Sequence, residues 1–332
     1  MKIGMISLMG NQPQRLSSHN AGWTFALKEI LTSKYNGEVY LLKQTDDINR
    51  FDMIVINNGI NFTAGAWNFI GGPPETLAPL LQKLSTYKGK LISFNHKVDL
   101  ANLVEKRKEF ADLKGTQFPD VELHSTLDNG KKLIIGDSHS LSVYRPDWGI
   151  SRNDGKTLFG ALRNDGEFIR HKIDEAGDID SLHLYFGNID VRFHLMRQPN
   201  PKEATLKLVR DYVEFVVRLS KGYDLDVTIQ GLIPIEDENR KLPGSGKHNG
   251  NNFYGTQEER QELVDYFNLL LRKNSFVGYY NFEEWDFEAP LSFDLMESRQ
   301  SVHIRPEFYY FEEFTNKFKP QVAKKPEQKT LF

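Results

Sequence analysis

Short apolar runs alternate with helix-spaced segments along the first 115 residues. Strand-like runs occupy Lys2–Leu8, Glu38–Leu42, Asp52–Asn57 and Lys90–Phe94, and helical spacing occurs at Ala21–Leu31 and Pro74–Leu84. Strands that alternate with helices favour a parallel sheet covered on both faces. Residues 1–115 are therefore predicted to form one α/β domain, whose ligands would bind beyond the carboxyl ends of the strands.

The same alternation returns after a polar stretch, residues 116–130, which we interpret as a linker. Residues 131–312 hold predicted strands at Lys132–Ile135, Leu182–Phe186, Asp226–Leu232 and Phe276–Phe282, and predicted helices at Glu203–Leu219 and Glu258–Leu271. The second helix opens with the capping pair Thr256 and Glu259. The fold class expected is α/β, with two Rossmann-like or flavodoxin-like three-layer domains and mainly parallel sheets. Residues 313–332 are expected to be a flexible basic tail.

Composition excludes several classes of protein. The chain has 332 residues, with 42 Lys and Arg against 45 Asp and Glu, so its net charge of −3 excludes a polycation that follows phosphate over its whole surface. The absence of cysteine excludes disulfides, a thiolate nucleophile and a cysteine metal site. No spacing suits a metal, and we expect no cofactor. With no signal peptide and no long apolar run, we expect a cytoplasmic protein that does not enter a membrane.

Chemistry-bearing residues follow predicted strands of the second block. Gly136-Asp137-Ser138 follows the first of them, where a serine meets backbone N–H groups that suit an anion; an ordinary turn has the same sequence. Asn188 follows another strand and could donate to an oxyanion, and beside it Asp190 and Arg192 could form a bracing ion pair or only a weak surface pair. His303 has a side chain suited to a general base, although a structural histidine is the default interpretation.

Taken in order, the segments GDSHS, FGNIDVR and SVHIRPE resemble the three motif blocks of the SGNH, or GDSL-type, hydrolase superfamily. The resemblance implies that Ser138, in the block with Asp137, is the nucleophile and that His303 is its base. It also implies that Asn188 and the Ser138 backbone N–H bind the oxyanion, with a glycine of the second block, Gly160, completing the hole. Apart from the resemblance, Trp148 is close to GDS in the sequence and could line the site, although a tryptophan more often belongs to a core or a pocket wall.

The chain departs from that family pattern at two positions. Asn188 stands one position early relative to G-x-N-D. Gln300 stands three residues before His303, where the family has an aspartate that orients the histidine. Glu297 or Asp294 would have to supply the orienting carboxylate, whose loss lowers activity without abolishing it.

The first block carries a resemblance of its own. The segments MKIGMISLMGN, FDMIVINNGINFTAGAWN and YKGKLISF are similar to the amino-terminal domain of the phage DNA β-glucosyltransferases. This resemblance implies a phage protein acting in the host cytoplasm, with a first domain that contacts duplex DNA carrying modified bases; a reused scaffold without a DNA role is the alternative. Phosphate contacts would come from a local basic cluster, which is otherwise a solvated face: Lys97, Lys106, Arg107 and Lys108.

The last five residues resemble the Q-x-x-L-F peptide with which bacterial and phage proteins dock on DNA sliding clamps. Gln328 would bond the rim of the clamp pocket, and Leu331 and Phe332 would fill it; a disordered end with chance apolar residues is the alternative. Three functions follow from these observations. The first is an SGNH-type hydrolase or acyltransferase, possible substrates including groups on modified DNA. The alternatives are a DNA-modifying glycosyltransferase acting on hydroxymethylated bases and a non-catalytic protein associated with DNA or a sliding clamp.

Overall fold

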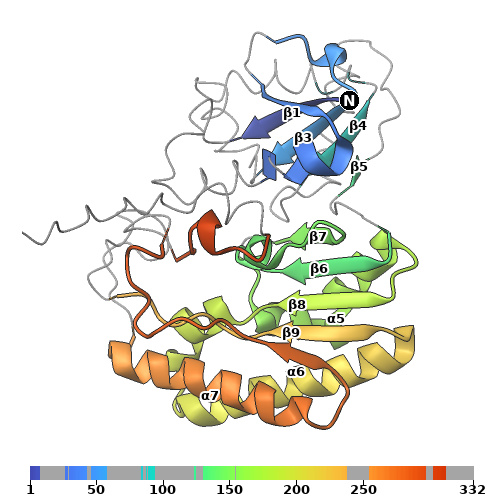
Figure 1. The fold of residues 1–332 in the computed structure, drawn as a ribbon. Coiled ribbons are helices and arrows are strands. Elements are labelled where there is room, and N and C mark those ends of the chain that lie inside the picture. Colours follow the sequence, from blue (N-terminus) through green and yellow to red (C-terminus); the bar gives the residue numbers. More distant parts are fainter. Residues whose placement is uncertain are drawn as a thin grey trace, which may run out of the picture.

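The structure is a computed structural model, and part of the chain is described in it. The described residues are 1–7, 27–28, 30–42, 46–57, 84, 87, 89–93, 123–124, 130–153, 155–237, 254–296 and 302–311. They include two separate β-sheets, each covered by helices or by extended chain (Figure 1).

The first sheet comes from the first 124 residues. Its strands are β1 (Lys2–Ser7), β2 (Glu38–Leu41), β3 (Met53–Asn57), β4 (Lys90–Ser93) and β5 (Leu123–His124). All neighbours are parallel and the order is β2-β1-β3-β4-β5, which is the flavodoxin-like order. The short strand β5 falls inside residues 116–130, so this interval is not only a linker: part of it extends the edge of the first sheet.

The second sheet repeats this order. Its strands are β6 (Lys132–Gly136), β7 (Gly149–Arg152), β8 (Ser181–Tyr185), β9 (Asp226–Gln230) and β10 (Asn281–Glu283). They run parallel in the order β10-β9-β8-β6-β7, so the chain reverses its winding direction between β6 and β8. Ligands of such sheets bind at this reversal, outside the carboxyl ends of the strands. The predicted fold class is therefore confirmed: α/β, with two parallel, flavodoxin-like sheets.

Local sequence signals account for the helix boundaries. Asn200 caps α6 (Pro201–Tyr223), with proline in the first turn, and Thr256 and Glu259 form the predicted capping box of α7 (Gln257–Ser275). The helix α5 (Leu158–Ala176) was not predicted, and its turns are interrupted at residues 163–166 by backbone in non-helical conformations. Shorter helices are η1 (Ile48–Arg50), η3 (Ser140–Val143), η4 (Asp190–His194), η5 (Leu195–Arg197) and η6 (Pro306–Phe308).

Two strands of the second sheet differ from the prediction: β10 begins later than expected, and β7 was not predicted. The strand expected at Phe276–Phe282 begins only at Asn281, because the chain makes turns over residues 277–280 and Gly278 has a φ of +82°. Strand β7 was missed, since its four residues carry too little periodicity to separate them from the turns on either side.

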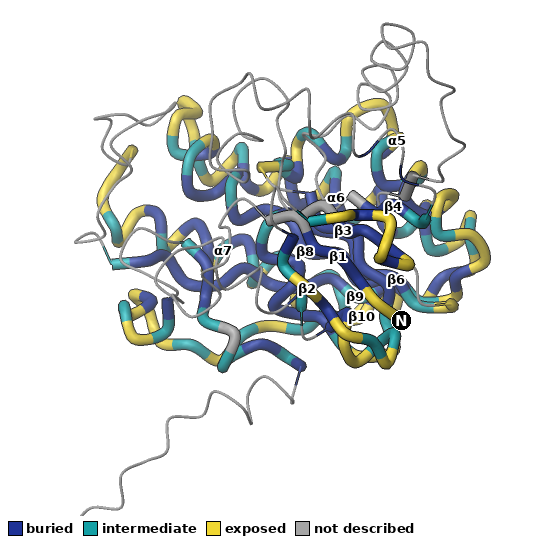
Figure 2. The backbone as a smooth tube through the Cα atoms, turned by 90° about the horizontal axis from the view of Figure 1, so that it is seen from above, coloured by how far each residue is buried: buried dark blue, intermediate teal, exposed yellow. Residues whose placement is uncertain are grey.

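The second sheet is buried on both faces, and different segments of the chain cover each face. Leu133, Ile135 and Leu184 face the side that α5, α6 and α7 cover. Ile134 and Tyr185 face the opposite side, where the C-terminal segment and buried residues of the first unit join them in one cluster. Figure 2 shows β6 and β8 passing through this interior as buried chain. The C-terminal segment, orange to red in Figure 1, returns from β10 toward the carboxyl ends of β6 and β8. Among the described residues, no helix has the length and apolar character needed to cross a membrane.

Close packing at the end of β6 leads to a stability prediction. A Cβ at Gly136 would lie 2.5 Å from the Tyr185 carbonyl oxygen and 2.8 Å from Ser140 Cβ. We expect Gly136→Ala to lower the free energy of unfolding by about 2–3 kcal/mol, measured by urea denaturation, because backbone would have to shift. Gly222→Ala is the control: Gly222 lies in α6 with nothing within 4 Å of an added Cβ. That variant should be more stable by about 0.5–1 kcal/mol, and equal losses at both positions would contradict the packing argument.

Candidate active site

The side chains of Ser138 and His303 meet at the carboxyl end of the second sheet. Ser138 Oγ lies 2.7 Å from His303 Nε2, although 165 residues separate them in sequence. Ser138 is only half-buried, whereas Asp137 and His139 on either side are buried, so Ser138 is the residue of these three that solvent reaches. The turn is tight because Asp137 N–H donates to the Tyr185 carbonyl, 3.0 Å away, which ties the end of β6 to β8.

The loop that carries His303 is held by backbone contacts at its base. Met296 and Ile304 form an antiparallel bridge, and the Arg305 N–H donates to the Leu295 carbonyl over 2.8 Å. The Arg305 side chain also donates from Nε to the Met296 carbonyl, 2.8 Å away. Leu291 N–H in turn donates to the Ile235 carbonyl over 2.8 Å, so the segment is joined to the loop that follows β9. These contacts bring a residue near the end of the chain to a serine at the start of the second sheet.

Asn188 lies beyond β8 and has a defined amide orientation. Arg192 Nη1 lies 3.2 Å from Asn188 Oδ1 and 3.3 Å from the Asn188 carbonyl. Since a guanidinium only donates hydrogen bonds, the amide atom that faces Arg192 is the oxygen. Asn188 Nδ2 therefore points elsewhere; it is buried and makes no hydrogen bond of ordinary geometry among the described residues. The Asn188 side chain does lie close enough to the Tyr185 hydroxyl to oppose the rise that burial causes in the pKa of that tyrosine. Arg192 is itself held by Glu236, with Nε donating to Oε2 over 2.8 Å in a pair that is almost wholly buried.

The predicted ion pair between Asp190 and Arg192 is wrong, because each side chain has a different partner. Asp190 accepts the backbone N–H groups of Leu158, at 2.7 Å, and Phe159, at 3.1 Å, at the start of α5. Burial raises the pKa of Asp190 to about 6, against the lowering effect of these two N–H groups. Asp190 thus fixes the start of α5 to the loop after β8, while Arg192 donates a hydrogen bond to the Asn188 side chain.

Two other predicted site residues lie elsewhere. Gly160 is in the first turn of α5, and its N–H donates to the Thr157 hydroxyl over 2.9 Å. That N–H caps the helix and does not complete an oxyanion hole. Trp148 precedes β7 at the amino end of the sheet, where its ring lies 5.8 Å from Lys132 Nζ. Because Lys132 begins β6 and Ser138 follows its end, Trp148 does not line the site.

The remaining predictions have different outcomes. Asp294 is exposed, and no hydrogen bond links it to His303, so it does not act as the orienting acid in this structure. Glu297 lies outside the described residues. The same is true of the proposed DNA-contacting and clamp-docking residues, which remain predictions: Lys97, Lys106, Arg107, Lys108, Gln328, Leu331 and Phe332.

Sequence reasoning assigned no role to His139 or Arg152. His139 is buried between Asp137 and the His303 loop, and its ring centroid lies 4.4 Å from that of His303. Arg152, only 2% exposed, is the last residue of β7 and pairs in register with Gly136. The signal for His139 was present in the GDSHS segment, directly after the serine. Arg152 could not be found without β7, which had not been predicted.

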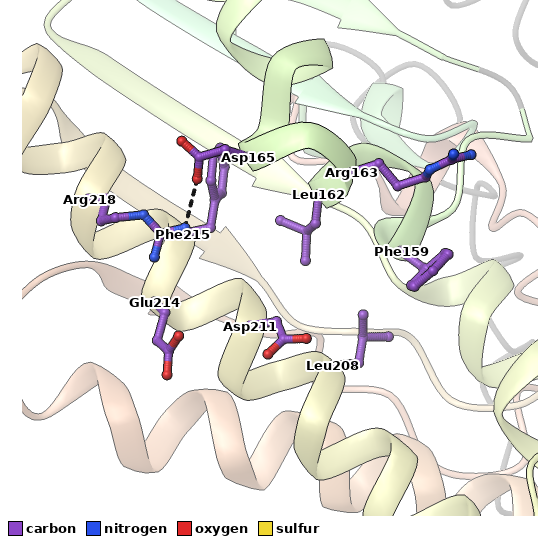
Figure 3. Close-up of a pocket in the computed structure, with 9 residues that line it drawn as sticks. All are labelled: Phe159, Leu162, Arg163, Asp165, Leu208, Asp211, Glu214, Phe215 and Arg218. Carbon is purple, nitrogen blue, oxygen red and sulfur yellow. Dashed lines mark hydrogen bonds and ion pairs between the residues drawn. The ribbon is translucent and has the colours of Figure 1, made fainter.

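Two cavities lie beside α5 and α6, and Ser138 lines neither of them. One of about 350 Å³ lies between α5 and α6, with Asp165 and Arg218 joined across it at 2.8 Å (Figure 3). A second, of about 460 Å³, reaches the loop after β8 and includes Asp190. Within the described ranges, no three side chains of the kinds that ligate metals come together.

Comparisons with known proteins say little about this chain. No protein-family model matches it, and no curated protein matches it. A solved structure described as a gut microbial diltiazem-metabolizing enzyme is similar with a TM-score of 0.34 and 14% sequence identity. The similarity covers 55% of this chain and 44% of that one, so this chain spans less than half of that protein's length. A likeness of this size carries no conclusion about function.

The raised pKa of Asp190 predicts a pH-dependent stability. Because burial lifts this pKa from 3.8 to about 6, the folded chain retains a proton that the unfolded chain releases between those values. The resulting stability is complete below pH 3.8 and is lost as the pH rises through 6. From pH 4 to pH 7, Asp190→Asn should therefore gain about 2 kcal/mol in free energy of unfolding relative to the parent, measured by urea denaturation at each pH.

A carboxylate shifted in the opposite direction provides the control. The hydrogen bond from Lys132 lowers the pKa of Asp147, so its contribution disappears only as the pH falls below the ordinary range for aspartate. The stability difference between Asp147→Asn and the parent should stay level from pH 4 to pH 7. A level difference for Asp190→Asn as well would show that Asp190 ionises normally in the folded chain.

Proposed function

We propose that this chain is an SGNH-type serine hydrolase or acyltransferase that uses Ser138 and His303. The observation that carries the proposal is the 2.7 Å separation of Ser138 Oγ and His303 Nε2. This is the distance at which an imidazole can take the proton of an attacking hydroxyl. The position supports the same conclusion, since both groups lie where the winding of a parallel sheet reverses.

The proposed reaction needs a proton carrier and an oxyanion site. Ser138 Oγ bonds to the acyl carbon of an ester-like substrate while its proton passes to His303 Nε2. The carbonyl electrons move onto oxygen, and the resulting oxyanion accepts hydrogen bonds from Asn188 Nδ2 and the Ser138 backbone N–H. When the tetrahedral centre collapses, the leaving group departs with the proton from His303. The oxygen of water or of an acceptor hydroxyl then bonds to the acyl carbon while its proton passes to His303. The bond between the acyl carbon and Ser138 Oγ breaks, and His303 returns the proton to Ser138.

The orientation of Asn188 favours this role over a purely structural one. A buried amide N–H group without a partner costs about 1–3 kcal/mol of stability. Here Arg192 and Glu236 hold the amide so that its donor, rather than its acceptor, is the unpartnered atom. A developing negative charge is the ligand that such a donor would stabilise best. Contact between the first unit and modified DNA stays a prediction.

Covalent labelling tests the nucleophile directly. We expect a fluorophosphonate probe to label the folded chain on Ser138, and Ser138→Ala to abolish both this labelling and p-nitrophenyl acetate turnover. His303→Ala should slow labelling by about 10³-fold, since the hydroxyl would lose its base. Ser181→Ala is the matched control, because that hydroxyl lies at the amino end of β8 and donates to Asp180. Absence of label on the folded parent, with no ester turnover, would refute the proposal.

The oxyanion role of Asn188 has a separate test. Asn188→Asp preserves size but replaces the donor with an acceptor, so kcat should fall by about 10²–10³-fold with little change in KM. The buried Arg192 would still have an oxygen to bind, so thermal unfolding should remain cooperative. Unchanged kcat in a folded Asn188→Asp variant would remove Asn188 from the mechanism.

A further inference from the structure

His139 lies where it can hold the loop that carries His303. Its Nε2 is 3.1 Å from the carbonyl oxygen of Val302, the residue directly before His303. Because a carbonyl oxygen only accepts hydrogen bonds, Nε2 carries a hydrogen and donates it to Val302. The His139 and His303 rings also lie close, with centroids 4.4 Å apart and planes inclined by 34°. His139 therefore contacts both the backbone and the imidazole of the loop.

Asp137 fixes the other side of the His139 ring. Asp137 Oδ1 lies 3.0 Å from His139 Nδ1 and accepts the His139 backbone N–H over 2.8 Å. The Asp137 side chain is fully buried, and its second oxygen has no hydrogen-bond partner among the described residues. Both contacts restrict the imidazole, so the ring has one orientation in which Nε2 reaches Val302.

Two serines of the short helix η3 bond to the backbone carbonyls of Asp137 and His139. The Ser140 hydroxyl donates to the Asp137 carbonyl over 2.8 Å, and the Ser142 hydroxyl donates to the His139 carbonyl over 2.7 Å. The Ser142 carbonyl in turn accepts the Tyr310 N–H over 2.8 Å. The turn after β6 and the C-terminal segment are thus joined at two places, Val302 and Tyr310, on either side of His303.

We propose that His139 is a positioning residue, which acts through its hydrogen bond to the Val302 carbonyl to hold His303 against Ser138. The inference rests on the proposed function for its effect on rate, but the tether itself is a structural claim. The GDSHS segment then carries the nucleophile together with the group that places its base.

Three substitutions at this position separate the hydrogen bond from ring packing. His139→Gln keeps a donor near the position of Nε2, His139→Asn keeps only a donor near Nδ1, and His139→Phe keeps a ring without a donor. We expect His139→Asn and His139→Phe to lower kcat for p-nitrophenyl acetate by about 10²-fold with little change in KM, because a small displacement of a reacting group costs that much. His139→Gln should stay within about threefold of the parent. The control is His171→Gln, an exposed histidine on α5.

Hydrogen–deuterium exchange provides a measurement that does not need activity. Amides of residues 302–305 should exchange faster in His139→Asn and His139→Phe than in the parent, with His139→Gln and His171→Gln unchanged. If residues 302–305 keep their exchange protection in all three His139 variants, the tether is wrong. It is also wrong if His139→Phe keeps the parent's kcat while His139→Gln loses it. If the parent shows no fluorophosphonate labelling while exchange follows the expected pattern, the hydrolase proposal fails and the tether stands.

Discussion

The 2.7 Å contact between Ser138 and His303 depends on how the C-terminal segment lies across the second sheet. That segment leaves β10, joins the loop after β9 at Leu291, and turns back through the bridge between Met296 and Ile304. Its apolar side chains belong to the buried cluster on the sheet face that α5, α6 and α7 leave open. Burial of this apolar surface is thus the force that brings an imidazole to the serine. Every chemical role proposed for the site presupposes this packing.

Buried charge supports the other half of the site. Arg192 and Glu236 form a pair with almost no exposure, and removal of one partner of such a pair costs about 3–5 kcal/mol. Replacement of both by well-packed apolar residues is often neutral, so stability alone gives little reason to keep the pair. Its consequence here is geometric: the guanidinium fixes which atom of the Asn188 amide faces away. A loop after β8 would otherwise leave that amide free to turn.

The two units share a topology, but the loops at the carboxyl ends of their strands are described only in the second unit. Both sheets have the flavodoxin-like order, with the reversal between their first and third strands. In the second unit the loops at that reversal carry Ser138 and Asn188. In the first unit the segments after β1, β3 and β4 lie outside the described residues, so the modified-base contact expected there rests on sequence resemblance. A shared fold does not imply a shared function.

Seven strands, β1 to β4, β6, β8 and β9, and the helices α6 and α7 could be predicted from the sequence, because apolar periodicity and capping residues act within a few positions. The pairing of Ser138 with His303 was proposed from the order of three motifs. The partners of Asp190, Arg192 and Gly160 were beyond such reasoning, since Asp190 and Arg192 bind groups more than 30 residues away and a helix start that periodicity did not reveal takes the Gly160 N–H. Long-range packing decides the partners of Asp190 and Arg192, and it also places His139 between the turn that carries Ser138 and the loop that carries His303. The Gly160 contact is local, but it could not be predicted without the start of α5.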